Sequence, residues 1–153
     1  MKQKEEVTRI LCLDVGEKRI GLAVSDTFGW TAQGLSTMTR RQDAQVFSAI
    51  SELCREYEVE HVIVGIPLDQ EGEMGPQAKK VEAFRHNLEH SLHEEGMFIP
   101  VEGIDERYST KDAEERLLEQ DVSRAKRKKI IDKMAAVVIL ESYLRQLEGK
   151  KKK

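Results

Sequence analysis

Acidic residues close two apolar stretches of the chain and interrupt a helical pattern in a third. Asp14 ends the run I-L-C-L-D, Asp105 ends the run M-F-I-P-V-E-G-I-D, and Glu106 directly follows it. Asp132 shares a helical face with Ala136, four residues further on, and with aliphatic side chains. A carboxylate in apolar surroundings requires a cation, a metal ion or a helix N-terminus as its partner. Converging carboxylates can hold two Mg²⁺ or Mn²⁺ ions about 4 Å apart, the arrangement that hydrolyses phosphodiester bonds.

Each acid also has a simpler structural interpretation. Asp14 can cap the turn that follows it, and the pair Asp105–Glu106 can be solvated beside a neighbouring arginine. Asp132 can be an acid in the first turn of a helix, where the helix dipole favours it. Because neighbouring side chains in a strand point to opposite faces, at most one of the pair can share a face with Asp14.

Basic residues gather just before Asp132 although the formal net charge of the chain is −3. Between residues 123 and 133 the only acid is Asp132, and the basic residues are Arg124, Lys126, Arg127, Lys128, Lys129 and Lys133. Such a run is either a solvated helix start or a surface that faces phosphates. Because a polyphosphate backbone must lie beside a metal site that cleaves it, the position next to Asp132 favours the phosphate-facing surface.

The composition favours one globular domain in a reducing compartment. The chain has 153 residues, of which 39% are apolar and 35% charged, so we expect a single domain over residues 1–153, with disordered tails at residues 1–7 and 148–153. Its apolar runs are too short for a membrane span, and the N-terminus lacks the apolar segment of a signal peptide. Two isolated cysteines, Cys12 and Cys54, argue against a disulfide framework. These features predict a cytoplasmic protein.

The hydrophobic pattern predicts a mixed α/β sheet in which strands come first. Three consecutive strands with short links favour an antiparallel meander, and the continuous apolar run at 61–68 is typical of a strand covered on both faces. The expected strands are Ile10–Asp14, Arg19–Asp26, Thr31–Thr39, His61–Leu68 and Met97–Asp105. The expected helices are Gln42–Tyr57, Gln77–Glu94, a short one at 109–119 and, after a link over Val122–Lys129, one at Lys128–Leu147. The order β-β-β-α-β-α-β-α-α gives a five-stranded sheet with helices on both faces.

Two other groups of residues invite a functional interpretation that the pattern does not support. His86, His90 and His93 recur at helical spacing, but they lie away from the apolar stripe of their helix and therefore face water. Phe28 and Trp30 flank a turn, where they can stack on a base, although a cap over the core is the favoured interpretation.

Four motifs of the chain resemble those of the YqgF family, the bacterial Holliday-junction-resolvase-like pre-16S rRNA nucleases. The first is D-V-G-E-K-R-I-G-L-A-V-S-D from Asp14, and the second is G-I-P-L from Gly65 with the glycines and apolar residues that follow it. The third is D-E-R-Y-S-T from Asp105, and the fourth is D-K-M-A-A-V-V-I-L-E-S-Y from Asp132. The likeness runs in order from about Thr8 to Leu147.

The resemblance implies a ribonuclease-H-like fold and metal-dependent cleavage of nucleic acid in maturation of the 5′ end of 16S rRNA. It implies Asp14, Glu106 and Asp132 as the catalytic and metal-binding acids, with two Mg²⁺ or Mn²⁺ ions, and favours Glu106 over Asp105. It further implies that Arg19 and Arg107 contact phosphates or orient the acids. Separately, and because of its position, the basic run before Asp132 adds Lys126, Arg127, Lys128 and Lys129 as nucleic-acid-binding residues. Ser25 and Ser109 are expected to form hydrogen bonds at the site rather than to act as nucleophiles.

The sequence leaves the substrate open. Structured pre-rRNA and branched DNA fit equally well, so the alternatives are a Holliday-junction resolvase and a nucleic-acid-binding module without catalysis. An actin-like ATPase requires two such domains around a nucleotide, and 153 residues provide one. The expected partner is nucleic acid and not a membrane, and the expected state is a monomer or a homodimer.

The basic run predicts a specific effect of charge removal. Replacing Lys126, Arg127 and Lys128 together with alanine is expected to weaken binding of all nucleic acids alike, because phosphate contacts carry no sequence information. The salt dependence of binding is expected to become shallower by roughly one slope unit for each phosphate that the variant no longer binds. Turnover at saturating substrate is expected to change much less. Binding across a salt series measures the effect, and unchanged affinity would identify the run as a solvated helix start.

Overall fold

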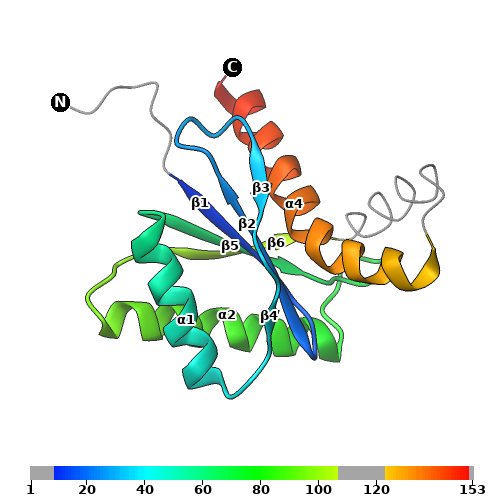
Figure 1. Cartoon of the computed structure of the whole chain (residues 1–153), viewed down its shortest axis with the longest axis horizontal. Helices are drawn as coiled ribbons and strands as arrows, with labels where there is room; N and C mark the ends of the chain where they lie inside the picture. Colours follow the sequence, from blue (N-terminus) through cyan, green and yellow to red (C-terminus); the bar gives the residue numbers. More distant parts are fainter. Residues whose placement is uncertain (1–8, 107–122, 152–153) are drawn as a thin grey trace.

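The strands form one mixed sheet of six strands in this computed structural model, which describes residues 9–106 and 123–151 (Figure 1). Along the chain they are β1 (Ile10–Val15), β2 (Arg19–Ser25), β3 (Ala32–Gly34), β4 (Met38–Thr39), β5 (His61–Ile66) and β6 (Val101–Asp105). The spatial order is β3-β2-β1-β5-β6, and β4 also pairs with β2. Among residues 124–133 and 148–151 the only side chain described is that of Lys126.

The pairing directions bring several strand ends to one edge. β2 lies antiparallel to β1, with Asp14 opposite Gly21, whereas β5 and β6 run parallel to β1 and to each other. The C-terminal ends of β1, β5 and β6 therefore lie at the same edge of the sheet, and the start of β2 joins them there. We call this edge the strand-end edge. The pairing directions alone place the last residues of β1 and the residue after β6 at this edge.

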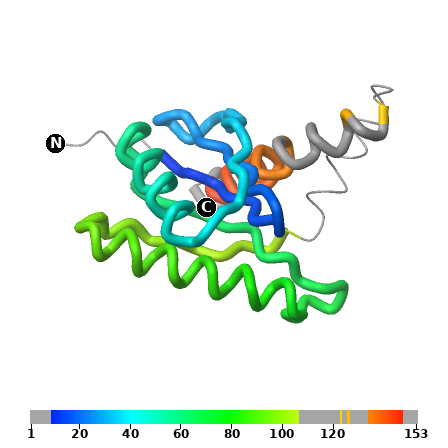
Figure 2. The backbone as a smooth tube through the Cα atoms, turned by 60° about the horizontal axis from the view of Figure 1, so that its bottom comes forward, coloured from blue at the N-terminus to red at the C-terminus, as the bar shows by residue number. Residues whose placement is uncertain are grey.

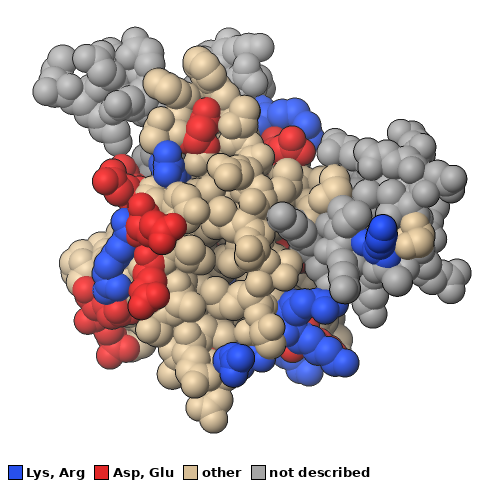
Figure 3. All heavy atoms as spheres, viewed as in Figure 1, with Lys and Arg blue, Asp and Glu red and all other residues tan. Residues whose placement is uncertain are grey.

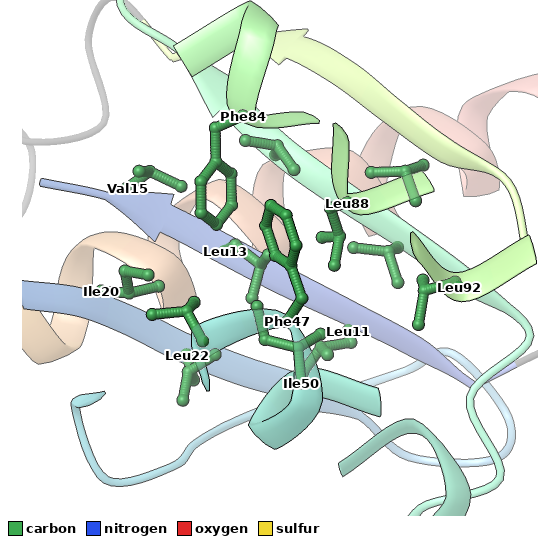
Figure 4. Close-up of a cluster of buried hydrophobic side chains, with 14 of the residues drawn as sticks. Leu11, Leu13, Val15, Ile20, Leu22, Phe47, Ile50, Phe84, Leu88 and Leu92 are labelled. Carbon is green, nitrogen blue, oxygen red and sulfur yellow. The ribbon is translucent and has the colours of Figure 1, made fainter. Parts of the chain in front are cut away.

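Helices cover the two faces of the sheet, α1 (Asp43–Glu56) and α2 (Pro76–Glu94) on one and α4 (Arg124–Lys151) on the other (Figures 1 and 2). The larger core lies between the sheet and the helix pair (Figure 4). Alternate residues of β1, Leu11, Leu13 and Val15, point into it, and the rings of Phe47 and Phe84 meet there edge to face, with centroids 5.3 Å apart. The alternation follows from the two-residue period of a strand.

A smaller core lies between the sheet and α4. The other face of β1 contributes Ile10 and Cys12, which pack with Ala23 of β2 and with Ala136 and Ile139 of α4. Ala135 and Ala136 are buried, and such small side chains allow the helix to approach the sheet closely. The residues of β1 that follow the same parity therefore face α4, and Asp14 is the next of them.

The meander differs from the expected one because the predicted strand at 31–39 is divided into two. β3 pairs with the end of β2 and β4 pairs with its start, so both follow the same neighbour. The Leu35 N–H still donates to the Leu22 carbonyl, at 2.9 Å, and the ladder is interrupted at the exposed residues Ser36 and Thr37. The sheet consequently has six strands rather than five.

The last helix begins at Arg124, so the prediction of a link over Val122–Lys129 was wrong for residues 124–129. Ser123 explains the early start, since its Oγ accepts a hydrogen bond of 3.4 Å from the backbone N–H of Lys126. A serine three residues before that donor is a helix N-cap. β6 begins at Val101, four residues later than predicted. The predicted first residue, Met97, is still hydrogen-bonded to the end of α2, since its N–H donates to the Leu92 carbonyl.

Several expectations fall on residues that the structure does not describe. The short helix at 109–119 and the tail at 1–7 lie outside the described residues, whereas α4 continues through residues 148–151. No helix among the described residues is both long enough and apolar enough to cross a bilayer.

Candidate active site

Asp14 and Glu106 meet at the strand-end edge, on the face that α4 covers. Asp14 follows the parity of Cys12 and is half-buried. Glu106 comes one residue after β6, and its backbone N–H still donates to the Ile66 carbonyl, at 3.3 Å, which continues the strand geometry. The two carboxyl groups form a side-chain hydrogen bond.

Asp105 is exposed and belongs to the other parity of β6. Val101 packs into the larger core, and a Cβ built on Gly103 would lie 2.9 Å from Cγ1 of Ile66, so these alternate residues face the helix pair. Strand alternation therefore brings Glu106, rather than Asp105, to Asp14.

Burial and like charge make Glu106 an unusual acid. Burial is the largest cause that raises its pKa, to about 8, followed by the negative charge of Asp14, the hydrogen bond with Asp14 and the charge of Asp105. Oε2 of Glu106 is buried and has no hydrogen-bond partner within the described part of the chain. Burial also raises the pKa of the Cys12 thiol, and the charges of Asp14 and Glu106 raise it further. The raised pKa values of Glu106 and Cys12 both reflect burial beside negative charge.

Gly65 allows the two carboxyl groups to meet. β5 lies between β1 and β6 in the sheet, and Gly65 of β5 pairs with Ile104, two residues before Glu106. A Cβ at Gly65 would overlap Oε2 of Glu106 and would lie 2.9 Å from Cδ1 of Ile139. Because glycine has no side chain, Gly65 leaves room for the carboxyl group of Glu106 between β5 and Ile139 of α4.

Arg19 lies beside Asp14, at the other end of the turn that joins β1 to β2, and Arg40 hydrogen-bonds to this turn. Arg19 starts β2, is exposed, and is a diagonal neighbour of Asp14 on the same face, since Asp14 pairs with Gly21. Arg40 Nη1 donates to the Gly16 carbonyl at 3.0 Å, and its guanidinium stacks over the Phe84 ring at 5.3 Å. Sequence reasoning missed Arg40, because no local pattern links it to a turn some 24 residues earlier.

The third predicted acid and most of the predicted basic residues are only partly described. Asp132 belongs to α4, one turn before Ala136, but its side chain lies outside the described part, as do those of Arg127, Lys128 and Lys129. Lys126 is exposed, and all of Arg107 lies outside the described residues. Among the described side chains no group of three potential metal ligands occurs.

Ser25 is not at the site, so the expectation for this residue was wrong. Its Oγ accepts a 2.8 Å hydrogen bond from the N–H of Ile10, at the opposite end of β1 from Asp14. Antiparallel pairing places the end of β2 beside the start of β1, and Ser25 closes that end of the ladder. Ser109 lies outside the described residues.

Two further predictions concern the histidines of α2 and the aromatic residues Phe28 and Trp30; the first is confirmed and the second is wrong. The three histidines of α2 are exposed as expected, and His90 Nε2 lies 3.4 Å from Glu94 Oε1. Trp30 does not cap the core, because 78% of its surface is exposed, and 43% of that of Phe28 is exposed too.

Charged side chains divide unevenly over the described surface (Figure 3). Exposed acids cluster around the C-terminal ends of α1 and α2: Glu52, Glu56, Glu58, Glu94 and Glu95. The strand-end edge carries both signs, with basic residues at Lys18, Arg41, Lys79 and Lys80 and acids in the loop at 69–73. The acidic helix ends would repel a polyphosphate, whereas the strand-end edge carries charges of both signs.

Comparison with solved structures identifies the fold class as ribonuclease-H-like, as predicted. RuvC of Thermus thermophilus in complex with a Holliday junction substrate superposes with a TM-score of 0.55 at 15% sequence identity, over 92% of this chain and 96% of that one. The yeast mitochondrial Holliday junction resolvase Ydc2 gives a TM-score of 0.51 at 9% identity, over 94% of this chain and 82% of that one.

The chain belongs to the RuvX family of nucleases, which confirms the resemblance to the YqgF family. The family model, described as Holliday junction resolvase, matches residues 8–146. Proteins named "Putative pre-16S rRNA nuclease" from Syntrophomonas wolfei and Moorella thermoacetica are 49% and 47% identical to the chain. The matches cover 89% and 91% of this chain and 93% and 96% of those proteins, respectively.

The raised pKa of Glu106 predicts a pH-dependent stability in the presence of a chelator. The folded protein retains a proton on Glu106 that the unfolded chain releases above about pH 4.5, so the free energy of unfolding is expected to fall as the pH rises from about 4.5 to about 8. Glu106→Gln removes this titration, and the variant is expected to be more stable than the wild type at pH 8 but not near pH 4.5. Urea denaturation at several pH values measures the difference. Asp105→Asn is the matched control, and a flattened profile in that variant instead would contradict the assignment.

Gly65→Ala is expected to displace the Glu106 side chain. Because the overlapped atoms are the ends of flexible side chains, the loss of stability should stay within about 1–3 kcal/mol, whereas a 1 Å misplacement of a catalytic group lowers activity by about 100-fold. Gly75→Ala is the control, since a Cβ at Gly75 meets nothing within 4 Å. Nuclease assays and denaturation curves of both variants test this, and equal activities would show that Gly65 does not set the position of Glu106.

Proposed function

We propose that the protein is a metal-dependent endonuclease that hydrolyses phosphodiester bonds in the 5′-end maturation of pre-16S rRNA. The observation that carries this proposal is the partly buried pair Asp14–Glu106, two carboxyl groups held together by a hydrogen bond at the strand-end edge, with Oε2 of Glu106 unpartnered within the described part of the chain. Buried acids pair with cations or stay protonated. A site of this kind is suited to bind divalent ions beside a phosphate backbone.

The donor set supports Mg²⁺ or Mn²⁺ as the cofactor. Asp14 and Glu106 offer only oxygen atoms, which these hard cations prefer, and Oε2 of Glu106 needs a partner. Asp14, Glu106 and Asp132 would hold two ions, which when bound activate a water molecule and neutralise charge on the scissile phosphate. α4 carries Asp132 one turn before Ala136, which is packed against the sheet.

The basic residues supply the remaining interactions of the proposed reaction. Arg19, exposed beside Asp14, binds phosphate oxygens at the strand-end edge. Lys126, which is exposed, and its neighbours Arg127, Lys128 and Lys129 hold the nucleic-acid backbone along the start of α4, and Arg107 contributes next to Glu106. Arg40 keeps the turn between Asp14 and Arg19 in place through its bond to the Gly16 carbonyl.

The names of the relatives support the ribosomal substrate. Two proteins named as pre-16S rRNA nucleases share almost half of their residues with this chain over nearly their full length. A cytoplasmic location is part of the proposal, because ribosomal precursors are matured there. Resolution of Holliday junctions is the second candidate, favoured by the description of the matching family model.

One experiment separates these candidates. Pre-16S rRNA and a four-way DNA junction are incubated with the protein side by side, in chelator, Mg²⁺ or Mn²⁺. We expect metal-dependent cleavage of the RNA; cleavage of the junction alone identifies a resolvase, and binding without cleavage of either identifies a binding module. Glu106→Gln should abolish cleavage and Asp105→Asn should not, so the reverse result would refute the choice of Glu106.

Asp132→Asn is expected to separate catalysis from binding. The change is nearly isosteric and exchanges a hard anionic ligand for a weaker neutral one, so metal-dependent cleavage should collapse. Binding of RNA should persist or tighten, because one negative charge near the phosphates is removed, and stability without metal should stay equal or rise. Single-turnover cleavage and RNA binding measure the two effects. Near-normal cleavage would show that Asp132 is not a metal ligand and leave the site with two acids; the helix-dipole interpretation no longer applies to it, because α4 begins at Arg124 and has no acid in its first turn.

A further inference from the structure

Two aromatic side chains project from the turn between β2 and β3. The rings of Phe28 and Trp30 stack with their centroids 5.2 Å apart and their planes at 28°. Trp30 is 78% exposed and Phe28 is 43% exposed, so both are among the large apolar side chains that contact solvent in the described part of the chain. Phe98, after α2, is equally exposed at 79%, but its ring is tilted by 51° against that of His93 and forms no stacked pair. We call Phe28 and Trp30 the aromatic pair.

The turn that carries the aromatic pair is held by Asp26. Its Oδ1 accepts hydrogen bonds from the N–H of Trp30 at 2.7 Å and of Thr31 at 3.3 Å. The Gly29 N–H donates to the Asp26 carbonyl at 3.2 Å, and Gly29 has a φ of 72°, which few other residues adopt. The aromatic pair is therefore presented by an ordered turn, and little conformational entropy remains to be lost when a flat ligand stacks on it.

The surroundings of the aromatic pair favour a nucleic acid. β3 begins at Ala32, which packs in the smaller core beside Leu144 and Leu147 near the end of α4, and Figure 1 shows the two at the same end of the molecule. Arg145, near the end of α4, is exposed, and the sequence beyond the described residues of that helix is basic. The acidic ends of α1 and α2 lie on the other face of the sheet. Aromatic rings beside positive charge are how proteins bind single-stranded nucleic acids without sequence preference.

We infer that the aromatic pair is a stacking platform for an unpaired nucleobase of the substrate, away from the position of cleavage. This inference rests on the proposed function, because it needs a nucleic-acid substrate. β2 joins the two places: it runs from Arg19 at the strand-end edge to Ser25 at the turn, six steps of about 3.3 Å each and so about 20 Å. A stacked strand rises about 3.4 Å per nucleotide, so the base would lie roughly six nucleotides from the reacting phosphate.

Trp30 is the only tryptophan of the chain, so its fluorescence reports on the platform directly. Single-stranded RNA and DNA oligonucleotides of about 12 residues are titrated in chelator, beside an abasic oligomer of the same length and charge. We expect quenching of Trp30 by the oligonucleotides with bases and not by the abasic oligomer. Trp30→Ala should raise the Kd for the former by about fivefold to a hundredfold, as the removal of one base–aromatic stack predicts, and Trp30→Phe should retain most of the affinity.

Phe98→Ala is the matched control, because it removes an equally exposed aromatic ring elsewhere on the surface and should leave the Kd unchanged. An unchanged Kd in Trp30→Ala overturns the platform, and if that variant still cleaves pre-rRNA the proposed function stands. A change of solution mass in Trp30→Ala without loss of RNA affinity also overturns it and identifies a contact between two copies. Quenching by the abasic oligomer contradicts stacking. If the wild type neither binds nor cleaves RNA, the proposed function itself fails.

Discussion

The repulsion between two carboxyl groups, Asp14 and Glu106, is the constraint on which the rest of the site depends. Water would separate or solvate them, but β1 and β6 hold their backbones and α4 buries them, so the pKa of Glu106 rises to about 8. The arrangement works only because Gly65, on the strand between them, has no side chain. Without a cation, the proton that Glu106 retains relieves this repulsion, and the proposed metal ions would take the place of that proton.

Much of the fold follows from periodicity in the sequence. Continuous apolar runs indicated the central strands, and the two-residue alternation of β6 indicated that only one of Asp105 and Glu106 could face Asp14. The start of α4 also has a local signal in the sequence, because Ser123 precedes a run of helix formers and serine is a common N-cap. This signal predicts a helix that begins at residue 124.

Other features depended on contacts between distant segments. Ser25 lies in a motif that begins with Asp14, yet antiparallel pairing places it at the far end of β1, where it satisfies the N–H of Ile10. The role of Arg40 depends on the Phe84 ring, on a different helix, and on the Gly16 carbonyl. The exposure of Trp30 depends on the path of the chain through the turn between β2 and β3. The residue type alone does not predict it, because an aromatic side chain beside a turn can either pack on the core or project into solvent.

The position of α4 in the chain order has a consequence for biosynthesis. The sheet and the helix pair α1 and α2 are complete once Glu106 has been made, whereas the face that holds Cys12, Ala23 and Ile63 stays uncovered until α4 follows. Domains fold as their segments leave the ribosome, N-terminal parts first. The nascent chain therefore exposes an apolar sheet face beside Asp14 and Glu106, and α4 packs against that face only when it docks as the last element.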